Sequence, residues 1–144
     1  MLIRTANKED VHDIYRFVCE LEDEQFNFDL FKPLFLQNIS TPNYHYLIAT
    51  EEDKAIGFIS CHGQTLLHHL GLVYEIQEIF VAENYRSKGV GKKLLQTLEE
   101  LISKENYELL EVASNMKRKD AHRFYLDNGF ECTTYKFKKN PGNK

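Results

Sequence analysis

Two glycines and several cations lie between an apolar segment and an amphipathic one, in the run Arg86-Ser87-Lys88-Gly89-Val90-Gly91-Lys92. A glycine loop that leads into a helix leaves backbone N–H groups unpaired and pointing outward. Cations at a helix start oppose the helix dipole, so Lys88 and Lys92 are poor choices for stability alone. Because both features suit a negatively charged ligand, the loop predicts an anion site, most simply for a diphosphate.

The segments on either side of the loop strengthen this interpretation. On its own, Gly-x-Gly before a helix can be no more than a tight turn. Here residues 75–81 have the β-branched and aromatic content of a strand, with partial alternation. Apolar residues then fall on one helical face, at Val90, Leu94, Leu95, Leu98, Leu101 and Ile102. The loop therefore joins a strand to a helix.

The run Arg86-x-x-Gly89-x-Gly91 after such a strand resembles the acetyl-CoA pyrophosphate loop of the GNAT superfamily of N-acetyltransferases. A second segment, residues 115–130, is similar to the family's Asn…Ala-x-x-Phe-Tyr-x-x-x-Gly-Phe block. The two segments occur in the expected order, and the resemblance spans nearly the whole chain. It implies acetyl-CoA as cosubstrate and a homodimer as the assembly.

Within the superfamily, four segments are similar to the aminoalkylphosphonate N-acetyltransferases: residues 19–21, 68–69, 75–78 and 117–125. This resemblance implies acetylation of the primary amine of a small molecule, an aminoalkylphosphonate. A polyamine, an amino acid or a protein N-terminus would suit the same fold. No motif places a cysteine as an acyl carrier, which favours direct transfer in a ternary complex. A non-catalytic CoA-binding sensor is the rival from another functional class.

For the cosubstrate, the resemblance implies that loop 86–92 holds the diphosphate through backbone N–H groups. The strand end at Ile79, Phe80 and Val81 would splay at a bulge and pair with the pantetheine amides as an added strand would. Asn115, just after a strand, would reach the pantetheine. Ordinary packing for Phe80 and Val81, and an ordinary turn for Asn115, are the competing interpretations.

Tyr125 is the candidate general acid, because the family places a tyrosine on this helix near the CoA sulfur. A phenol with a pKa of about 10 donates to a thiolate whose conjugate acid has a pKa of about 8.5. That transfer is slightly uphill, so the hydrogen bond itself matters more than full transfer. A core aromatic is the alternative, since Phe124 and Tyr125 are neighbours.

Glu75 and Glu78 are the candidate bases for the amine, which must lose a proton before it can attack. Carboxylates on a central strand are costly unless they face a cavity or a partner. Alternation sets the two on opposite faces unless a bulge intervenes. We favour Glu78, which lies closer to the thioester end, with a salt-bridged or solvated glutamate as the alternative.

Histidines gather around the same strands, at His45, His62, His68 and His69. They would line the acceptor pocket, or two of them would bind a divalent metal with Glu75 or Glu78. No spacing typical of a metal motif supports the second interpretation, and surface or hydrogen-bonded histidines are the simplest one. Lys117, Arg118, Lys119 and Arg123 would attract phosphonate or phosphate groups, or simply be solvated.

The elements that must position these groups are expected in the order βααβββαβαβ, a mixed α/β sheet flanked by helices. The predicted strands are 2–5, 44–50, 54–63, 72–81, 107–113 and 130–137, and the predicted helices are 9–25, 29–38, 90–104 and 119–128. Asn7 is the expected N-cap of the first helix, Pro33 suits a first turn, and Gly129 is the expected left-handed C-cap. Residues 65–71 fit a loop or a strand extension.

The 144 residues, 42% of them hydrophobic, predict one domain over residues 1–144 with a sizeable core. A net charge of −4 argues against a nucleic-acid partner, and no apolar run is long enough to cross a membrane. Three scattered cysteines without a Cys-x-x-Cys pair indicate reduced thiols and a cytoplasmic location.

Overall fold

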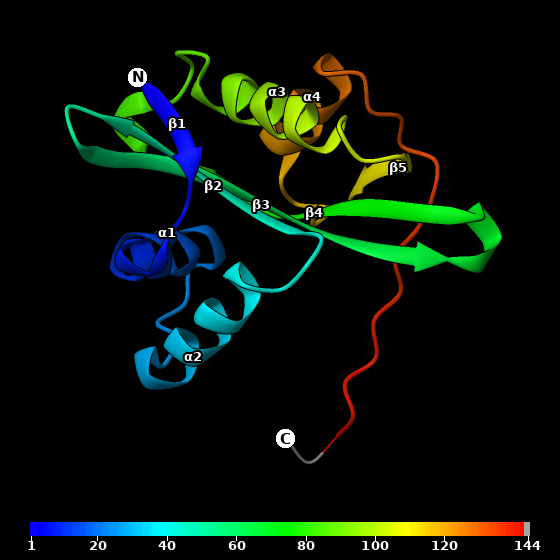
Figure 1. Ribbon diagram of the computed structural model, residues 1–144, viewed down its shortest axis with the longest axis horizontal. Coiled ribbons are helices and arrows are strands. Elements are labelled where there is room, and N and C mark those ends of the chain that lie inside the picture. Colours follow the sequence, from blue (N-terminus) through cyan, green and yellow to red (C-terminus); the bar gives the residue numbers. More distant parts are fainter. Residues whose placement is uncertain (143–144) are drawn as a thin grey trace. The chain divides into compact units, whose positions relative to one another are not determined.

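The computed structural model describes residues 1–142, which contain a five-stranded sheet in the order β1-β2-β3-β4-β5 (Figure 1). The strands are β1 Leu2–Thr5, β2 Tyr44–Glu51, β3 Lys54–Leu66, β4 Gly71–Val81 and β5 Tyr107–Val112. The helices are α1 Val11–Glu22, α2 Phe28–Ile39, α3 Val90–Ile102 and α4 Lys119–Asp127. Neighbouring strands are antiparallel except β4 and β5, which are parallel, so the expected mixed α/β fold is confirmed.

The chain divides into two compact units, Met1–Val112 and Ala113–Lys144. The first unit holds the whole sheet with α1, α2 and α3, and the second holds α4. In the first unit, α1 and α2 cover one face of the sheet and α3 covers the other (Figure 1).

Two hairpins fix the register of the first unit. Glu52 and Asp53 join β2 to β3 with φ angles of 50° and 63°, so both adopt the left-handed conformation of a tight hairpin turn. Residues 65–71, which the sequence fits either as a loop or as a strand extension, contain both. β3 continues to Leu66, and a short 3-10 turn, Leu67–His69, leads into β4. The β3–β4 hairpin therefore extends past the end of β2 (Figure 1).

Helix boundaries follow local signals with two departures. Asn7 forms the expected capping box with Asp10, but a 3-10 turn, Lys8–Asp10, precedes α1. Pro33 lies in the interior of α2, not in its first turn, because the helix already begins at Phe28 behind the cap Asn27. The missing N–H of Pro33 removes one helical hydrogen bond, which the flanking packing must offset.

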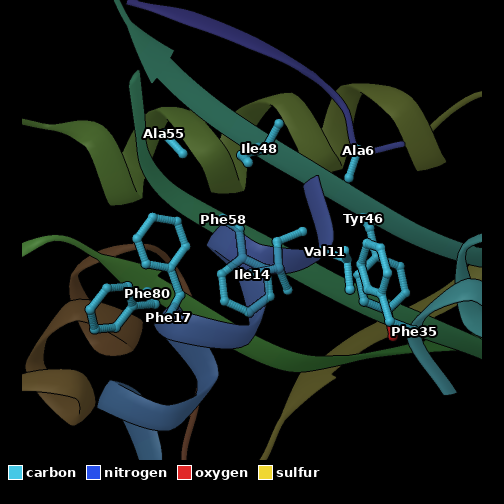
Figure 2. Close-up of a cluster of buried hydrophobic side chains, with 10 residues drawn as sticks. All are labelled: Ala6, Val11, Ile14, Phe17, Phe35, Tyr46, Ile48, Ala55, Phe58 and Phe80. Atoms are coloured by element: carbon cyan, nitrogen blue, oxygen red, sulfur yellow. The ribbon is translucent and has the colours of Figure 1, made fainter. Parts of the chain in front are cut away.

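The core on the α1–α2 face consists of side chains from both helices and the three central strands. Figure 2 shows Phe17 of α1 beside Phe58 of β3 and Phe80 of β4, with ring centroids 6.1 and 5.1 Å from that of Phe17. Phe35 of α2 lies edge-on to Tyr46 of β2 at 5.9 Å. Burial of these large rings fixes α1 and α2 against this face of the sheet.

In the second unit, α4 ends as its sequence predicts. Gly129 has a φ of 91°, and the N–H groups of Gly129 and Phe130 bond to the carbonyls of Leu126 and Tyr125. These two bonds are a Schellman motif, so Gly129 is the C′ residue.

The predicted strand at 130–137 is wrong: this segment forms no helix or strand. Tyr135 and Phe137 are 88% and 90% exposed. Alternating side chains indicate a strand only where an adjacent strand pairs the backbone groups, and among the described residues this segment has none.

Candidate active site

The glycine loop forms an uncapped helix start. Gly89 is the N-cap of α3 with a φ of 84°, and Ser87 before it also has a positive φ, 61°. Within the described residues, no side chain caps this helix and no acidic residue lies in its first turn. A Cβ at Gly89 would meet nothing within 4 Å. The loop therefore offers backbone N–H groups, nearby cations and open space, which is the environment an anion needs.

Arg86 ties this loop back to β4. Its Nε donates to the carbonyl of Val81 at 2.8 Å, and its guanidinium lies 5.3 Å from the centroid of the Phe80 ring. Lys88 lies 5.8 Å from the ring centroid of Tyr85. Arg86 therefore helps to set the position of the loop relative to the end of β4.

β4 separates from β5 before it reaches the loop. Pairing with β5 covers only residues 72–76, whereas pairing with β3 continues to Val81. Because Ala82 donates to Ile56 of β3 at 2.8 Å, alternation directs the backbone groups of Ile79 and Val81 away from β3. These are the backbone positions at which an extended ligand could pair with the strand.

A bulge at Gln77 lies where the two strands part. Ser60 pairs with Glu78, but the next residue, Cys61, pairs with Ile76, so Gln77 is an extra residue in β4. With this insertion Glu75 pairs with His62 and Glu78 with Ser60. The two glutamates therefore share one face of the sheet, the face that α1 and α2 cover, and the alternation expected without a bulge does not hold.

On that face, two cross-strand rows of polar residues lie beside the apolar core. We call them the polar patch, and it consists of Tyr46, Ser60 and Glu78 in one row and Tyr44, His62 and Glu75 in the next. Each row takes one residue from β2, one from β3 and one from β4. The adjoining row is apolar, Ile48, Phe58 and Phe80, so the patch begins where the core ends.

Glu78 is held by Ser60, which is fully buried. The Ser60 hydroxyl donates to Glu78 Oε1 and accepts from the backbone N–H of Glu78 at 3.2 Å. Burial raises the pKa of Glu78, the Ser60 hydrogen bond opposes this, and the charge of Glu22 on α1 adds to it. Glu78 Oε2 has no hydrogen-bond partner among residues 1–142, and it is not one of their fully buried unpaired atoms, so it keeps some accessible surface.

His62 is the centre of the second row. Its ring stacks on Tyr44 with centroids 3.6 Å apart, and its Nε2 lies 2.9 Å from the Tyr46 hydroxyl. The same hydroxyl accepts from Asn38 Nδ2 of α2 at 2.9 Å. Burial lowers the pKa of His62, and the charge of Glu75 opposes this. Burial likewise raises the pKa of Tyr46 to about 12.

The other sequence-predicted groups in the first unit lie apart from this patch. His45 is on the opposite face of the sheet, 3.6 Å from Glu105, and His68 and His69 occupy the tip of the β3–β4 hairpin. No group of three or more His, Cys, Asp or Glu residues in the described chain could hold a metal ion. The geometry thus gives no support to the divalent-metal interpretation.

The second unit holds Asn115 and Tyr125. Asn115 Oδ1 accepts from the N–H of Lys117 at 2.9 Å, which is the geometry of an ordinary Asx turn. Tyr125 packs edge-on against Phe124 and Phe130, with centroids 5.6 and 5.7 Å away. Burial raises the pKa of Tyr125, and the charge of Arg118 opposes this shift.

Four residues of this site carry no signal in the sequence: Asn38, Tyr44, Tyr46 and Ser60. None belongs to a motif, and they meet Glu78 and His62 only through strand register and the packing of α2. Alternation of β2 and β3 could have placed Tyr46 and Ser60 on one face. It could not have indicated that Glu78 joins them, because that depends on the bulge.

Known proteins match this chain over most of its length. The Acetyltransferase (GNAT) family model matches residues 9–130. An aminoalkylphosphonate N-acetyltransferase of Salmonella typhimurium is 37% identical over 137 residues, 95% of this chain and 89% of that protein. An uncharacterized N-acetyltransferase of Bacillus subtilis is 30% identical and covers 93% of this chain and 94% of its own length. The expected likeness to the aminoalkylphosphonate group is confirmed.

Solved structures share the fold. An aminoglycoside N-acetyltransferase, AAC(6')-Iy, in complex with CoA has a TM-score of 0.87 at 17% identity, covering 98% of this chain and 94% of that one. A transcriptional regulator from Bacillus halodurans has a TM-score of 0.88 at 18% identity, covering 96% and 98%. None of the helices in residues 1–142 is long and apolar enough to span a membrane. By its sequence match and its fold, the chain belongs to the GNAT family of acetyltransferases.

Proposed function

We propose that this chain transfers the acetyl group of acetyl-CoA to the primary amine of an aminoalkylphosphonate, by direct transfer while both substrates are bound. The relative at 37% identity supports the substrate class. The observation that carries the proposal is the bulge at Gln77, which sets Glu75 and Glu78 on the polar patch at the point where β4 leaves β5. We further propose that residues 1–144 act as one acetyltransferase domain, since the family match spans both units.

Acetyl-CoA fits the residues present. The backbone N–H groups of loop 86–92 would hold its diphosphate, and the open space at Gly89 leaves room for close approach. The N–H and C=O of Ile79 and the N–H of Val81 would pair with its pantetheine arm, flanked by Phe80, and Asn115 would lie along the same arm. When bound, acetyl-CoA supplies the acetyl group as a thioester.

Glu78 is the proposed general base. The amine is protonated at neutral pH and must lose a proton before it can attack. Glu78 presents an open oxygen, Oε2, while Ser60 fixes its other oxygen. A carboxylate whose pKa is raised by burial takes a proton more readily than an exposed one, which suits this role. Glu75, across from His62, is the second carboxylate of the patch.

Tyr125 is the proposed general acid for the departing thiolate. Its raised pKa keeps the phenol protonated at neutral pH, so that the hydroxyl has a proton to donate. Hydrogen bonding to the sulfur supplies most of the stabilisation, because full transfer from a phenol to a thiolate is uphill.

The test is a thiol-release assay with acetyl-CoA and a panel of amines: aminoalkylphosphonates, a polyamine, an amino acid and a peptide N-terminus. The proposal predicts turnover on the aminoalkylphosphonates with the highest kcat/KM of the panel. Turnover on another class of acceptor alone would support the acetyltransferase activity but refute the aminoalkylphosphonate as substrate. Tight CoA binding without turnover on any amine would indicate the non-catalytic sensor instead.

A further inference from the structure

The hydrogen bonds around Tyr46 indicate which nitrogen of His62 carries a proton. The Tyr46 oxygen accepts the N–H of Asn38 at 2.9 Å, and His62 Nε2, 2.9 Å away, is the one atom among residues 1–142 that can accept the Tyr46 O–H, so we infer that Tyr46 donates to Nε2. An Nε2 that accepts a hydrogen bond is unprotonated, so the neutral ring carries its proton on Nδ1. A His62 pKa lowered by burial keeps the ring in this neutral form at neutral pH.

The resulting Nδ1–H is a donor without a protein acceptor. It has no hydrogen-bond partner among residues 1–142, and it is not one of their fully buried unpaired atoms, so it keeps some accessible surface. Stacking on Tyr44 at 3.6 Å, with the two ring planes 4° apart, fixes the direction of this N–H. A donor with a fixed direction and no protein acceptor, at the edge of a core, is preorganised to donate a hydrogen bond to a ligand.

The patch offers a matching acceptor. Glu78 Oε2 is open on the same face, and Ser60, its cross-strand partner, lies two residues before His62 on β3. Diagonal neighbours in a sheet are roughly 7–8 Å apart between Cα atoms. The site therefore presents a carboxylate and a ring N–H on diagonal neighbours of one sheet face, an arrangement that suits a cationic amine joined to an oxyanion by a short linker.

We propose that His62 Nδ1–H donates a hydrogen bond to the oxyanion of the acceptor while Glu78 Oε2 accepts one from the acceptor's amino group. His62 would then select short amino-oxyanions over simple amines. The inference rests on the amine acetylation proposed above and adds a specificity-determining residue to it. The shared chemistry is that of a phosphonate or a carboxylate, each with an oxygen that accepts from a ring N–H.

Glu75 is a carboxylate that would oppose an oxyanion at His62, because it pairs directly with His62 across the strands. Its Oε1 accepts from the Gln77 amide at 3.1 Å, and the bulge that places Gln77 here brings that amide to the carboxylate. This contact holds one oxygen of Glu75 at Gln77, and the charge of Glu75 remains, since it still acts on the pKa of His62.

The test compares two variants whose side chains imitate different halves of the imidazole. His62→Gln places its amide near the Nε2 position, keeps a contact for Tyr46 and removes the Nδ1–H. His62→Asn places an amide donor near the Nδ1 position. The acceptors are 2-aminoethylphosphonate, β-alanine and propylamine at saturating acetyl-CoA, with His68→Gln on the exposed hairpin tip as the control. Thermal unfolding confirms that each variant is folded.

His62→Gln is expected to lower kcat/KM for an amino-oxyanion about 10- to 100-fold and to leave propylamine nearly unchanged, since a hydrogen bond to a charged group is lost. His62→Asn is expected to retain more of that activity. Whether kcat/KM falls for 2-aminoethylphosphonate, for β-alanine or for both identifies the oxyanion that His62 binds. An equal loss on all three acceptors would show a structural role and overturn the inference.

A second readout does not depend on turnover. Nitrogen chemical shifts of the wild-type ring should show the Nδ1–H tautomer at neutral pH, and addition of 2-aminoethylphosphonate should shift the Nδ1 resonance. An Nε2–H tautomer, or an unmoved resonance at saturating ligand, would refute the role of His62. If the wild type acetylates no amine, the proposed function fails, while this shift still decides whether His62 binds the oxyanion.

Discussion

Replacing Ser60 with Ala should move the acidic limb of the enzyme's pH profile without abolishing activity. The Ser60 hydroxyl donates to Glu78 Oε1 and so favours the ionised carboxylate. A hydrogen bond to a charged group contributes about 1.5–3 kcal/mol, and one pKa unit corresponds to about 1.4 kcal/mol. Protonated Glu78 can still accept from Ser60, so we take the lower end and expect the pKa of Glu78 to rise by about one unit.

The assay is kcat/KM for the amine from about pH 4.5 to 9 at saturating acetyl-CoA, a range that begins at the ordinary pKa of a glutamate. Ionisation of the substrate amine affects wild type and variant equally. The ratio of the two pH profiles therefore reports only the ionisation of groups on the enzyme. Because the base must be ionised to act, a raised pKa predicts a variant that is impaired at low pH and close to wild type at high pH. A ratio that stays constant across the range would refute the link between Ser60 and Glu78.

Stability must be separated from this effect. Ser60→Ala also removes the acceptor of the Glu78 N–H, which should destabilise the fold by about 1–3 kcal/mol. Thr50→Ala, at another buried polar position of the same sheet, is a matched control. It should lower the unfolding temperature and leave the pH profile unmoved.

Three further variants test other parts of the site. Glu78→Gln should raise the unfolding temperature at about pH 8 but not at about pH 3.5, because the raised pKa of Glu78 means that wild type loses stability as pH rises through it; equal gains at both pH values would contradict that pKa direction. Tyr125→Phe should lower kcat about 10²-fold or more and leave the CoA dissociation constant nearly intact; undiminished turnover would remove Tyr125 from the mechanism. Gly89→Ala forces a side chain into a left-handed conformation at about 1–2 kcal/mol and fills the open space of the loop, so calorimetry should show CoA affinity at least tenfold weaker; unchanged affinity would argue against a diphosphate at this loop.

The parts of the fold that depend on local chemistry could be predicted from the sequence. Asn7 caps the start of its helix and Gly129 ends α4 in the left-handed conformation, as their residue types predict. The Gly89 loop lies between the expected strand and helix. Each of these features needs only a few consecutive residues, so one sequence is enough to specify it.

The arrangement of the polar patch could not be predicted in the same way. One extra residue at Gln77 moves Glu75 onto the face of Glu78, and strand pairing alone brings Ser60 to that carboxylate. The wrong prediction of a strand at residues 130–137 has a related cause. Tyr135 and Phe137 alternate as strand residues do, but their segment has no strand partner among residues 1–142. Register and pairing are properties of two segments together, and the periodicity of one segment does not contain them.

Acetyl-CoA and an amino-oxyanion are proposed to react on this chain with Glu78 as base. The most direct measurement is product formation from acetyl-CoA and 2-aminoethylphosphonate, followed by mass spectrometry and thiol release, for wild type and Glu78→Gln. Wild type should form N-acetylated product and free CoA in equal amounts, and the variant should form them at a rate lower by about 10²-fold or more. Equal rates for the two proteins would refute the role of Glu78, and no product from either at saturating substrates would refute the reaction.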